Sequence, residues 1–129
     1  MTENRRLIAE NVSLGYGDHL VIDDLGFEVP AGRITSIVGA NGCGKSTLLR
    51  AVARLIKPRT GAVMLDGRAQ HEYPSRELAR VLGLLPQSPI TPEGITVTDL
   101  VGRGRHPHQG AFARWSKRDY EAVADALEV

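Results

Sequence analysis

Residues 38–49, with the sequence VGANGCGKSTLL, carry the residue types best suited to phosphate chemistry in this chain. Gly39, Gly44, Lys45 and Ser46 match the pattern G-x-x-x-x-G-K-[ST]. Glycines let successive backbone N–H groups approach phosphate oxygens, and a helix that begins behind them adds partial positive charge. A glycine-rich turn before a helix is the plainer interpretation, but an apolar strand, the loop and a helix follow in the order that phosphate binding requires. The sequence therefore predicts a phosphate loop for a nucleotide.

The loop predicts a role for each of its polar groups. Lys45 can bridge the two outer phosphates as a point charge, and the Ser46 hydroxyl is placed to bind Mg²⁺. The backbone N–H groups of Ser46 and Thr47 face the inner phosphates. We expect the nucleotide to contact Gly39, Asn41, Gly42, Cys43, Gly44, Lys45, Ser46 and Thr47.

Cys43 has two interpretations. In the plainer one it is a small residue that fills a tolerant position of the loop. In the other, the helix N-terminus and Lys45 favour the thiolate and make it reactive, so that MgATP slows its alkylation.

The elements that must position the loop follow an α/β pattern. The segment 33–39 is nearly continuously apolar, which is typical of a parallel strand buried on both faces. The helix that follows is expected from Gly44 to about Ile56, and Pro58 ends it. Thr96 with Asp99, and Ser116 with Asp119, have the spacing of capping boxes. Strands are predicted at 7–16, 19–23, 25–29, 33–39, 61–67 and 81–87. Helices are predicted at 75–80 and 97–104, and a third begins at Ser116, with its pattern still continuing at Val129.

Composition limits the classes of function. The chain has 129 residues, enough for one modest domain, and its formal net charge of +1 gives no overall field toward nucleic acid or an anionic membrane. We find no apolar run long enough for a secretory leader or a membrane span. The single cysteine excludes an internal disulfide and disfavours zinc. We expect a cytosolic protein without a transmembrane segment of its own.

Three stretches together resemble the nucleotide-binding subunits of ABC transporters: SLGYGDHLVIDDLGFEVPAGRITSIVGANGCGKSTLL (13–49), KPRTGAVMLDGR (57–68) and VLGLLPQ (81–87). The resemblance implies that Tyr16 stacks on adenine, where the alternative is an exposed tyrosine at a strand end. It also implies that Gln87 is the Q-loop glutamine, which binds Mg²⁺ or the attacking water; otherwise Gln87 is an ordinary loop residue. Lys45 and Gln87 are thereby the expected catalytic residues, and Ser46 and Gln87 the expected Mg²⁺ ligands.

Residues 95–128 resemble the subunits of iron–siderophore, haem and cobalamin importers, most clearly in GRGRHPHQG (102–110). The resemblance implies that this region docks on a cytoplasmic helix of the membrane subunit. A solvated basic face is the competing interpretation. His106 and His108 flank Pro107 without a neighbouring carboxylate or cysteine, which disfavours a metal site. The basic residues are Arg103, Arg105, Arg114, Lys117 and Arg118, and Phe112 and Trp115 lie among them.

The implied fold is the N-terminal half of a P-loop NTPase cassette, with residues 1–129 as an incomplete ABC ATP-binding domain. It would hold an antiparallel β subdomain and part of a parallel sheet with the phosphate-loop helix, around an incomplete core. Residues 88–129 contain no LSGGQ-type signature, no Walker B strand and no switch histidine. We therefore expect the isolated chain not to hydrolyse ATP efficiently, and to be marginally stable, aggregation-prone or oligomeric.

The implied function is that of an ATP-binding subunit of an importer for iron–siderophores or related metal chelates, at the cytoplasmic face of the membrane. Its cofactors would be ATP and Mg²⁺. Its partners would be permease subunits, a second ATP-binding subunit and, indirectly, a periplasmic or lipoprotein substrate-binding protein, with no nucleic acid. The alternatives are the ATPase of another ABC class, such as an exporter or a DNA-repair cassette, and a catalytically dead nucleotide-binding fragment that pairs with an intact subunit.

Overall fold

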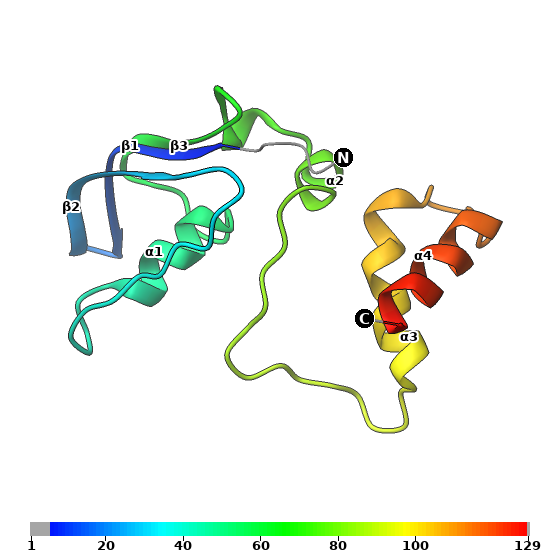
Figure 1. Cartoon of the computed structure of the whole chain (residues 1–129). Coiled ribbons are helices and arrows are strands. Elements are labelled where there is room, and N and C mark those ends of the chain that lie inside the picture. The colour runs from blue at the N-terminus through cyan, green and yellow to red at the C-terminus, as the bar shows by residue number, and fades with distance from the viewer. Residues whose placement is uncertain (1–5, 129) are drawn as a thin grey trace. The chain divides into compact units, whose positions relative to one another are not determined.

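A computed structural model describes residues 6–128 of the chain (Figure 1). The chain divides into two compact units, Met1–Pro74 and Ser75–Val129.

The first unit is built on a four-stranded antiparallel sheet in the order β2-β1-β3-β4. The strands are β1 (Leu7–Tyr16), β2 (His19–Val29), β3 (Thr60–Leu65) and β4 (Arg68–Ala69). An Asp-Gly turn joins β3 to β4: Asp66 and Gly67 have φ of 53° and 78°, the left-handed pair that suits a two-residue hairpin turn. The antiparallel part of the expected fold is thus confirmed.

The two strands predicted at 19–23 and 25–29 are one continuous strand, β2. Asp24, where we expected a break, has φ of 49° and lies opposite Asn11, whose φ is 48°. The Asn11 side-chain amide donates to the Asp24 carboxylate at 2.8 Å. The pairing of β1 with β2 shifts register near this point, so the irregularity is a β-bulge within the strand.

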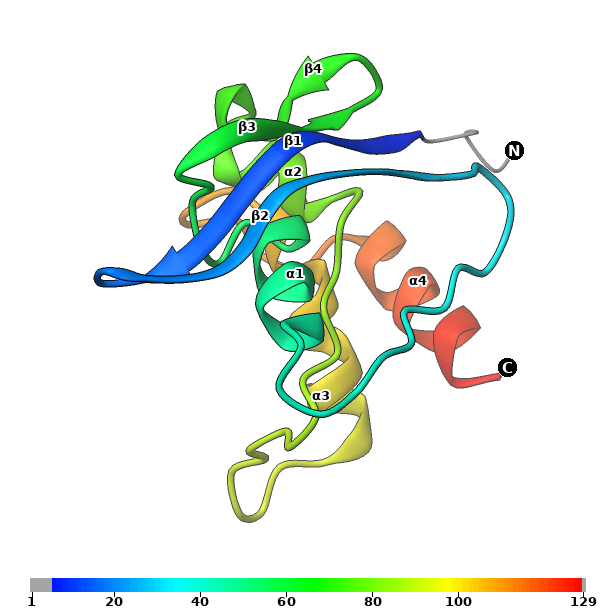
Figure 2. The ribbon, with the colours of Figure 1, turned by 90° about the vertical axis from the view of Figure 1, so that its left-hand side faces the viewer.

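Helix α1 (Lys45–Val52) packs against the sheet (Figure 2). Leu14 of β1 is fully buried against Leu48 and Ala51 of the helix, with Ile22, Leu25, Phe27 and Ile56 packed around them. The helix ends four residues before the predicted Ile56, because Arg54 takes a left-handed conformation with φ of 58°. This apolar contact fixes the helix, and hence the loop before it, relative to β1 and β2.

Two side chains hold the C-terminal end of α1 in place. The Arg54 guanidinium donates to the carbonyl oxygens of Gln70 and Tyr73, at 3.3 and 2.6 Å. In return the buried Gln70 side-chain amide donates to the carbonyl oxygen of Val52. Gln70 begins the short 3₁₀ helix η1 (Gln70–Glu72), which therefore supplies the cap that a helix end needs.

The strands predicted at 33–39 and 81–87 are not formed, and those predictions are wrong for this chain. Both segments are irregular, and their apolar side chains face outward: Ile34 is 99%, Val38 89% and Leu85 87% exposed. A strand is held by hydrogen bonds to a neighbour, and neither segment has a paired neighbour among the described residues. The parallel part of the expected sheet is therefore missing from the described chain.

The second unit is helical, with α2 (Ser75–Ala79), α3 (Val97–Gly102), the 3₁₀ helix η2 (Arg103–His108) and α4 (Lys117–Leu127). Both predicted N-caps are confirmed. Thr96 Oγ1 accepts from the backbone N–H of Asp99 at 3.1 Å, and Ser116 with Asp119 forms a complete capping box. The predicted helix 97–104 ends as α-helix at Gly102 and continues as η2, and α4 ends at Leu127.

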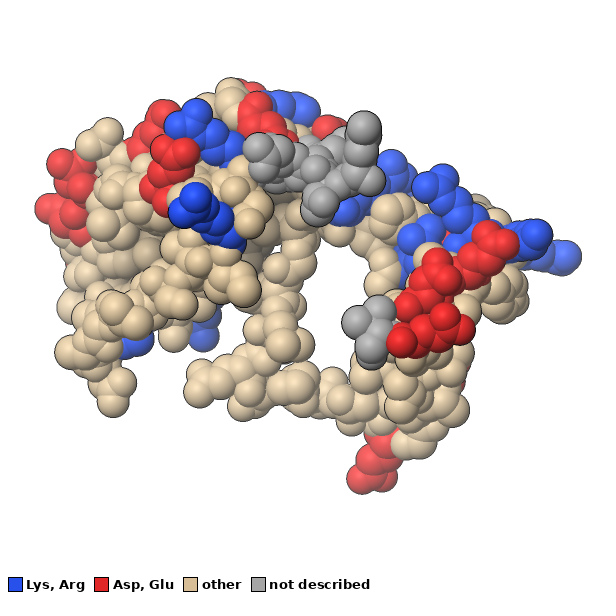
Figure 3. Space-filling model, viewed as in Figure 1, with Lys and Arg blue, Asp and Glu red and all other residues tan. Residues whose placement is uncertain are grey.

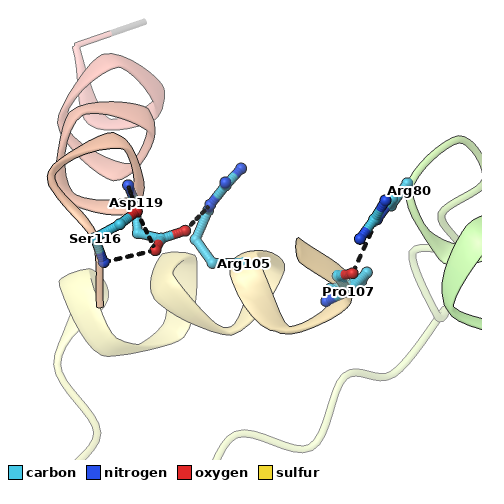
Figure 4. Close-up of polar contacts among 5 residues, drawn as sticks. All are labelled: Arg80, Arg105, Pro107, Ser116 and Asp119. Carbon is cyan, nitrogen blue, oxygen red and sulfur yellow. Dashed lines mark hydrogen bonds and ion pairs between the residues drawn. The ribbon is translucent and has the colours of Figure 1, made fainter. Parts of the chain in front are cut away.

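Asp119 joins α4 to η2 (Figure 4). Its carboxylate accepts from the backbone N–H and the hydroxyl of Ser116, at 2.9 and 2.7 Å, and from Arg105 Nε at 2.8 Å. These bonds, first those from Ser116 and then that from Arg105, lower the pKa of Asp119 to about 2. Arg80 Nε donates to the Pro107 carbonyl oxygen at 3.0 Å, which links α2 to η2.

Candidate functional site

The start of α1 has the backbone shape of an anion site. Gly44 precedes the helix as its N-cap with φ of 102°, and Gly42 has φ of 80°. A Cβ on Gly44 would lie 3.0 Å from Cγ1 of both Val21 and Ile22 in β2. Conformation and space therefore both require glycine at position 44.

The backbone N–H groups at the start of α1 lack a side-chain acceptor. The N-cap is a glycine without a capping side chain, and the first turn carries no acidic residue. The first N–H groups of a helix have no partner within it, and the helix dipole adds partial positive charge there. A bound anion would supply the acceptor that the sequence does not.

The Lys45 ammonium lies against the loop that precedes it. Nζ donates to the carbonyl oxygens of Gly39 and Ala40, at 2.8 and 2.7 Å, and lies 3.8 Å from Cys43 Sγ. A turn closes the loop, with the Cys43 N–H donating to the Ala40 carbonyl oxygen at 3.3 Å. The loop residues from 39 to 43 and Ser46 are exposed, while Thr47 is buried. Of the predicted phosphate contacts, Gly39 and Cys43 thus lie at the Lys45 ammonium, and the roles of the whole set in binding remain predictions.

Tyr16 lies at the end of β1 and reaches the same helix. Arg50 donates to its hydroxyl at 3.0 Å. The pKa of Tyr16 is lowered, first by the Thr47 side chain and then by the bond to Arg50. With 43% of its surface exposed, the ring remains accessible to a ligand. The structure therefore brings Tyr16 beside the helix that begins in the phosphate loop.

Gln87 is exposed in the irregular segment before α3, in the second unit. Ser46 belongs to the first unit, and shared binding of Mg²⁺ by Ser46 and Gln87 stays a prediction. Among residues 6–128, no group of three or more histidine, cysteine, aspartate or glutamate side chains could hold a metal ion by itself. A hydroxyl and an amide are weak ligands alone, so Mg²⁺ would depend on phosphate oxygens for most of its coordination.

Sequence reasoning missed the contacts of Arg50 and Gln70. Arg50 gave no local signal, because its partner is 34 residues away in sequence. Gln70 gave no signal, because a glutamine after a turn is usually exposed. Each contact depends on how the helix packs on the sheet.

The basic segment 100–118 runs from the end of α3 through η2 to the start of α4, and Figure 3 shows Lys and Arg side chains of the second unit beside the acidic side chains of α4. Five basic residues and no acidic one occur in the segment 100–118. Trp115 packs on Gly102 and stacks at a tilt on Tyr120, with 5.1 Å between ring centroids. It lines two hollows, one of about 370 Å³ with Val123 and Leu127, and one of about 460 Å³ with Arg103 and His106. Phe112 is fully exposed.

The chain matches the family model described as "ABC transporter" over residues 22–129. It is 55% identical over 119 residues to "Probable siderophore transport system ATP-binding protein YusV" of Bacillus subtilis (strain 168), covering 92% of this chain and 43% of that protein. It is 52% identical over 129 residues to "Ferric enterobactin transport ATP-binding protein FepC" of Escherichia coli (strain K12), covering 99% of this chain and 48% of that protein. The chain therefore spans about half the length of the curated relatives it matches.

The fold is similar to that in the structure of a bacterial Atm1-family ABC exporter with ATP bound. The TM-score is 0.75 at 28% identity, and the match covers 99% of this chain and 21% of the exporter chain. Within residues 6–128, no helix has both the length and the apolar character needed to cross a membrane.

Proposed function

Because this chain belongs to the ABC transporter family, we propose that residues 1–129 are the ATP-binding part of a transport ATPase subunit. The observation that carries the proposal is the start of α1. There a left-handed Gly44, an uncapped helix N-terminus and the Lys45 ammonium converge on one exposed loop. Those groups suit a chain of phosphates, and the Tyr16 ring beside the same helix suits a purine base.

Mg²⁺, when bound, would neutralise charge on the outer phosphates. Ser46 would supply a hydroxyl ligand to it, and Gln87 would supply an amide oxygen. Lys45 carries the charge that holds the outer phosphates. Phosphoryl transfer depends on positioning and charge stabilisation. Residues 88–129 contain no Walker B carboxylates, so this chain alone binds ATP without efficient hydrolysis.

We further propose that the parent subunit serves uptake of iron–siderophores or a related metal chelate at the cytoplasmic face of the membrane. The names of the two relatives support this class. Its partners would be permease subunits, a second ATP-binding subunit and, through the permease, a substrate-binding protein. The basic segment 100–118, with Trp115 and the exposed Phe112, has the aromatic and arginine composition of an interface.

Calorimetric titration of the chain with MgATP tests the binding part of the proposal. Wild type should bind, and Lys45→Met should weaken binding at least tenfold, because the outer phosphates lose their charged partner. Lys57→Met is the matched control, since it removes an exposed lysine beyond the end of α1. Equal affinity of the Lys45 variant and wild type would contradict the proposed site.

The proposed class of transported substrate is tested by measuring uptake in cells. Lys45→Met in the chromosomal gene should abolish uptake of ⁵⁵Fe-labelled siderophore and leave amino-acid uptake unchanged. If the strain with Lys45→Met takes up iron normally and the wild-type chain binds MgATP, the subunit belongs to another class of ABC ATPase. Expression of residues 1–129 beside an intact subunit tests the remaining alternative, because a dead nucleotide-binding fragment that pairs with it would inhibit uptake.

A further inference from the structure

The hydroxyl of Tyr16 is tied to α1 by one hydrogen bond. Arg50, in the second turn of the helix, donates to it at 3.0 Å. This bond joins the end of β1 to the helix that begins in the phosphate loop. It leaves the ring itself accessible, because 43% of the residue is exposed.

The tether matters because an exposed tyrosine at a strand end would otherwise sample several rotamers. Fixing a free side chain at the moment of binding weakens affinity by about two- to tenfold. A ring whose hydroxyl is already held avoids most of that loss. Because Arg50 belongs to α1, its bond also holds the ring near Lys45 and Ser46 at the start of the same helix.

We propose that Arg50 is a positioning residue that sets the preference for a purine nucleotide over a bare chain of phosphates. It holds the Tyr16 hydroxyl and so presents the aromatic face at a fixed distance from the phosphate loop. Arg50 acts through Tyr16 and does not touch the nucleotide. The inference rests on the proposed function, because it takes Tyr16 to be the residue that stacks on the base.

The test compares two ligands on the same protein. MgATP and magnesium tripolyphosphate both use the phosphate loop, but only MgATP carries a base. The ratio of their affinities is insensitive to the folded fraction of a variant, since both ligands bind the same folded molecules. Calorimetry on the whole chain should show that Arg50→Met weakens MgATP about three- to tenfold and leaves tripolyphosphate within about twofold.

Variants of the partner make the test specific. Tyr16→Phe keeps the ring and removes only the hydroxyl, so it should weaken MgATP as much as Arg50→Met does. The double variant Tyr16→Phe with Arg50→Met should be no weaker than either single change, because both remove the same bond. Arg50→Lys should recover most of the affinity, since an ammonium can still donate to the hydroxyl.

Two outcomes overturn the inference. An unchanged ratio of the two affinities, whether both fall equally or neither changes, would show that Arg50 has no effect on base recognition. Additive losses in the double variant would show that the two residues act separately. Tyr16→Ala separates this inference from the proposed function. If that change also leaves the ratio of the MgATP and tripolyphosphate affinities unaltered, the Tyr16 ring does not bind the base, and the proposed role of Tyr16 is refuted before that of Arg50.

Discussion

Replacing Gly44 with alanine tests whether the backbone shape of the loop is what binds phosphate. Gly44 has φ of 102°, and an added Cβ would lie 3.0 Å from Cγ1 of both Val21 and Ile22. Both neighbours are β-branched, so their χ1 angles are restricted and they can move little to make room. The substitution therefore meets two independent obstacles, one in the backbone and one in packing.

The size of each obstacle follows from the geometry. A left-handed backbone costs a residue with a Cβ about 1–2 kcal/mol, and overpacking adds about 1–3 kcal/mol. Gly42 is the matched control, since its φ is 80° and no atom lies within 4 Å of an added Cβ. Gly42→Ala should therefore lose only the backbone contribution of about 1–2 kcal/mol, and Gly44→Ala about 2–5 kcal/mol in total.

The loss can take two forms, and both must be measured. If the loop keeps its shape, the strain lowers the free energy of unfolding. If the exposed loop relaxes, the protein stays folded, but binding must restore the shape, so affinity falls instead. The quantity to compare is the sum of the lost unfolding free energy and the lost binding free energy.

The assays are urea unfolding followed by circular dichroism and calorimetric titration with MgATP. For Gly44→Ala the sum should exceed that for Gly42→Ala by at least about 1 kcal/mol. Equal sums would refute the packing argument. Sums below about 0.5 kcal/mol for both variants would refute the claim that the left-handed loop is needed at all.

Three further outcomes are expected. The folded pKa of Asp119, about 2, lies below the unfolded value of about 3.9. This carboxylate therefore adds stability above about pH 4 that is lost as the pH falls toward 2. Asp119→Asn should remove that part of the pH dependence of the urea midpoint. MgATP should slow alkylation of Cys43, the exposed thiol in the phosphate loop, and equal labelling rates with and without nucleotide would exclude that reactivity. Because Ile34, Val38 and Leu85 are exposed, the isolated chain should form oligomers in analytical ultracentrifugation, and a monodisperse monomer that melts cooperatively would contradict this.

Much of the fold follows from signals that lie close together in the sequence. The Asp66–Gly67 turn and the caps at Thr96 and Ser116 each depend on residues within three positions of one another. The start of α1 was predicted to within one residue for the same reason, because glycine, lysine and serine at fixed spacing specify the loop and the helix together.

The predictions that are wrong concern segments whose structure depends on residues distant in the sequence. The apolar runs at 33–39 and 81–87 have strand composition, but no described strand pairs with them, and they remain irregular. The break expected at Asp24 became a bulge because β1 pairs with β2 on both sides of it. Helix α1 ends early because the backbone of Arg54 is left-handed, and its side chain bonds to the carbonyl oxygens of Gln70 and Tyr73.

The sequence alone determined the phosphate loop and its helix, since the glycines and Lys45 act through backbone conformation and a charge at fixed spacing. Only the tertiary structure decided which side chains contact the loop's helix. Arg50 hydrogen-bonds to Tyr16, 34 residues away in sequence, and Gln70 to Val52, 18 residues away. Such contacts exist only after the apolar face of α1 has packed against the sheet, because that packing is what brings distant polar groups within hydrogen-bonding distance.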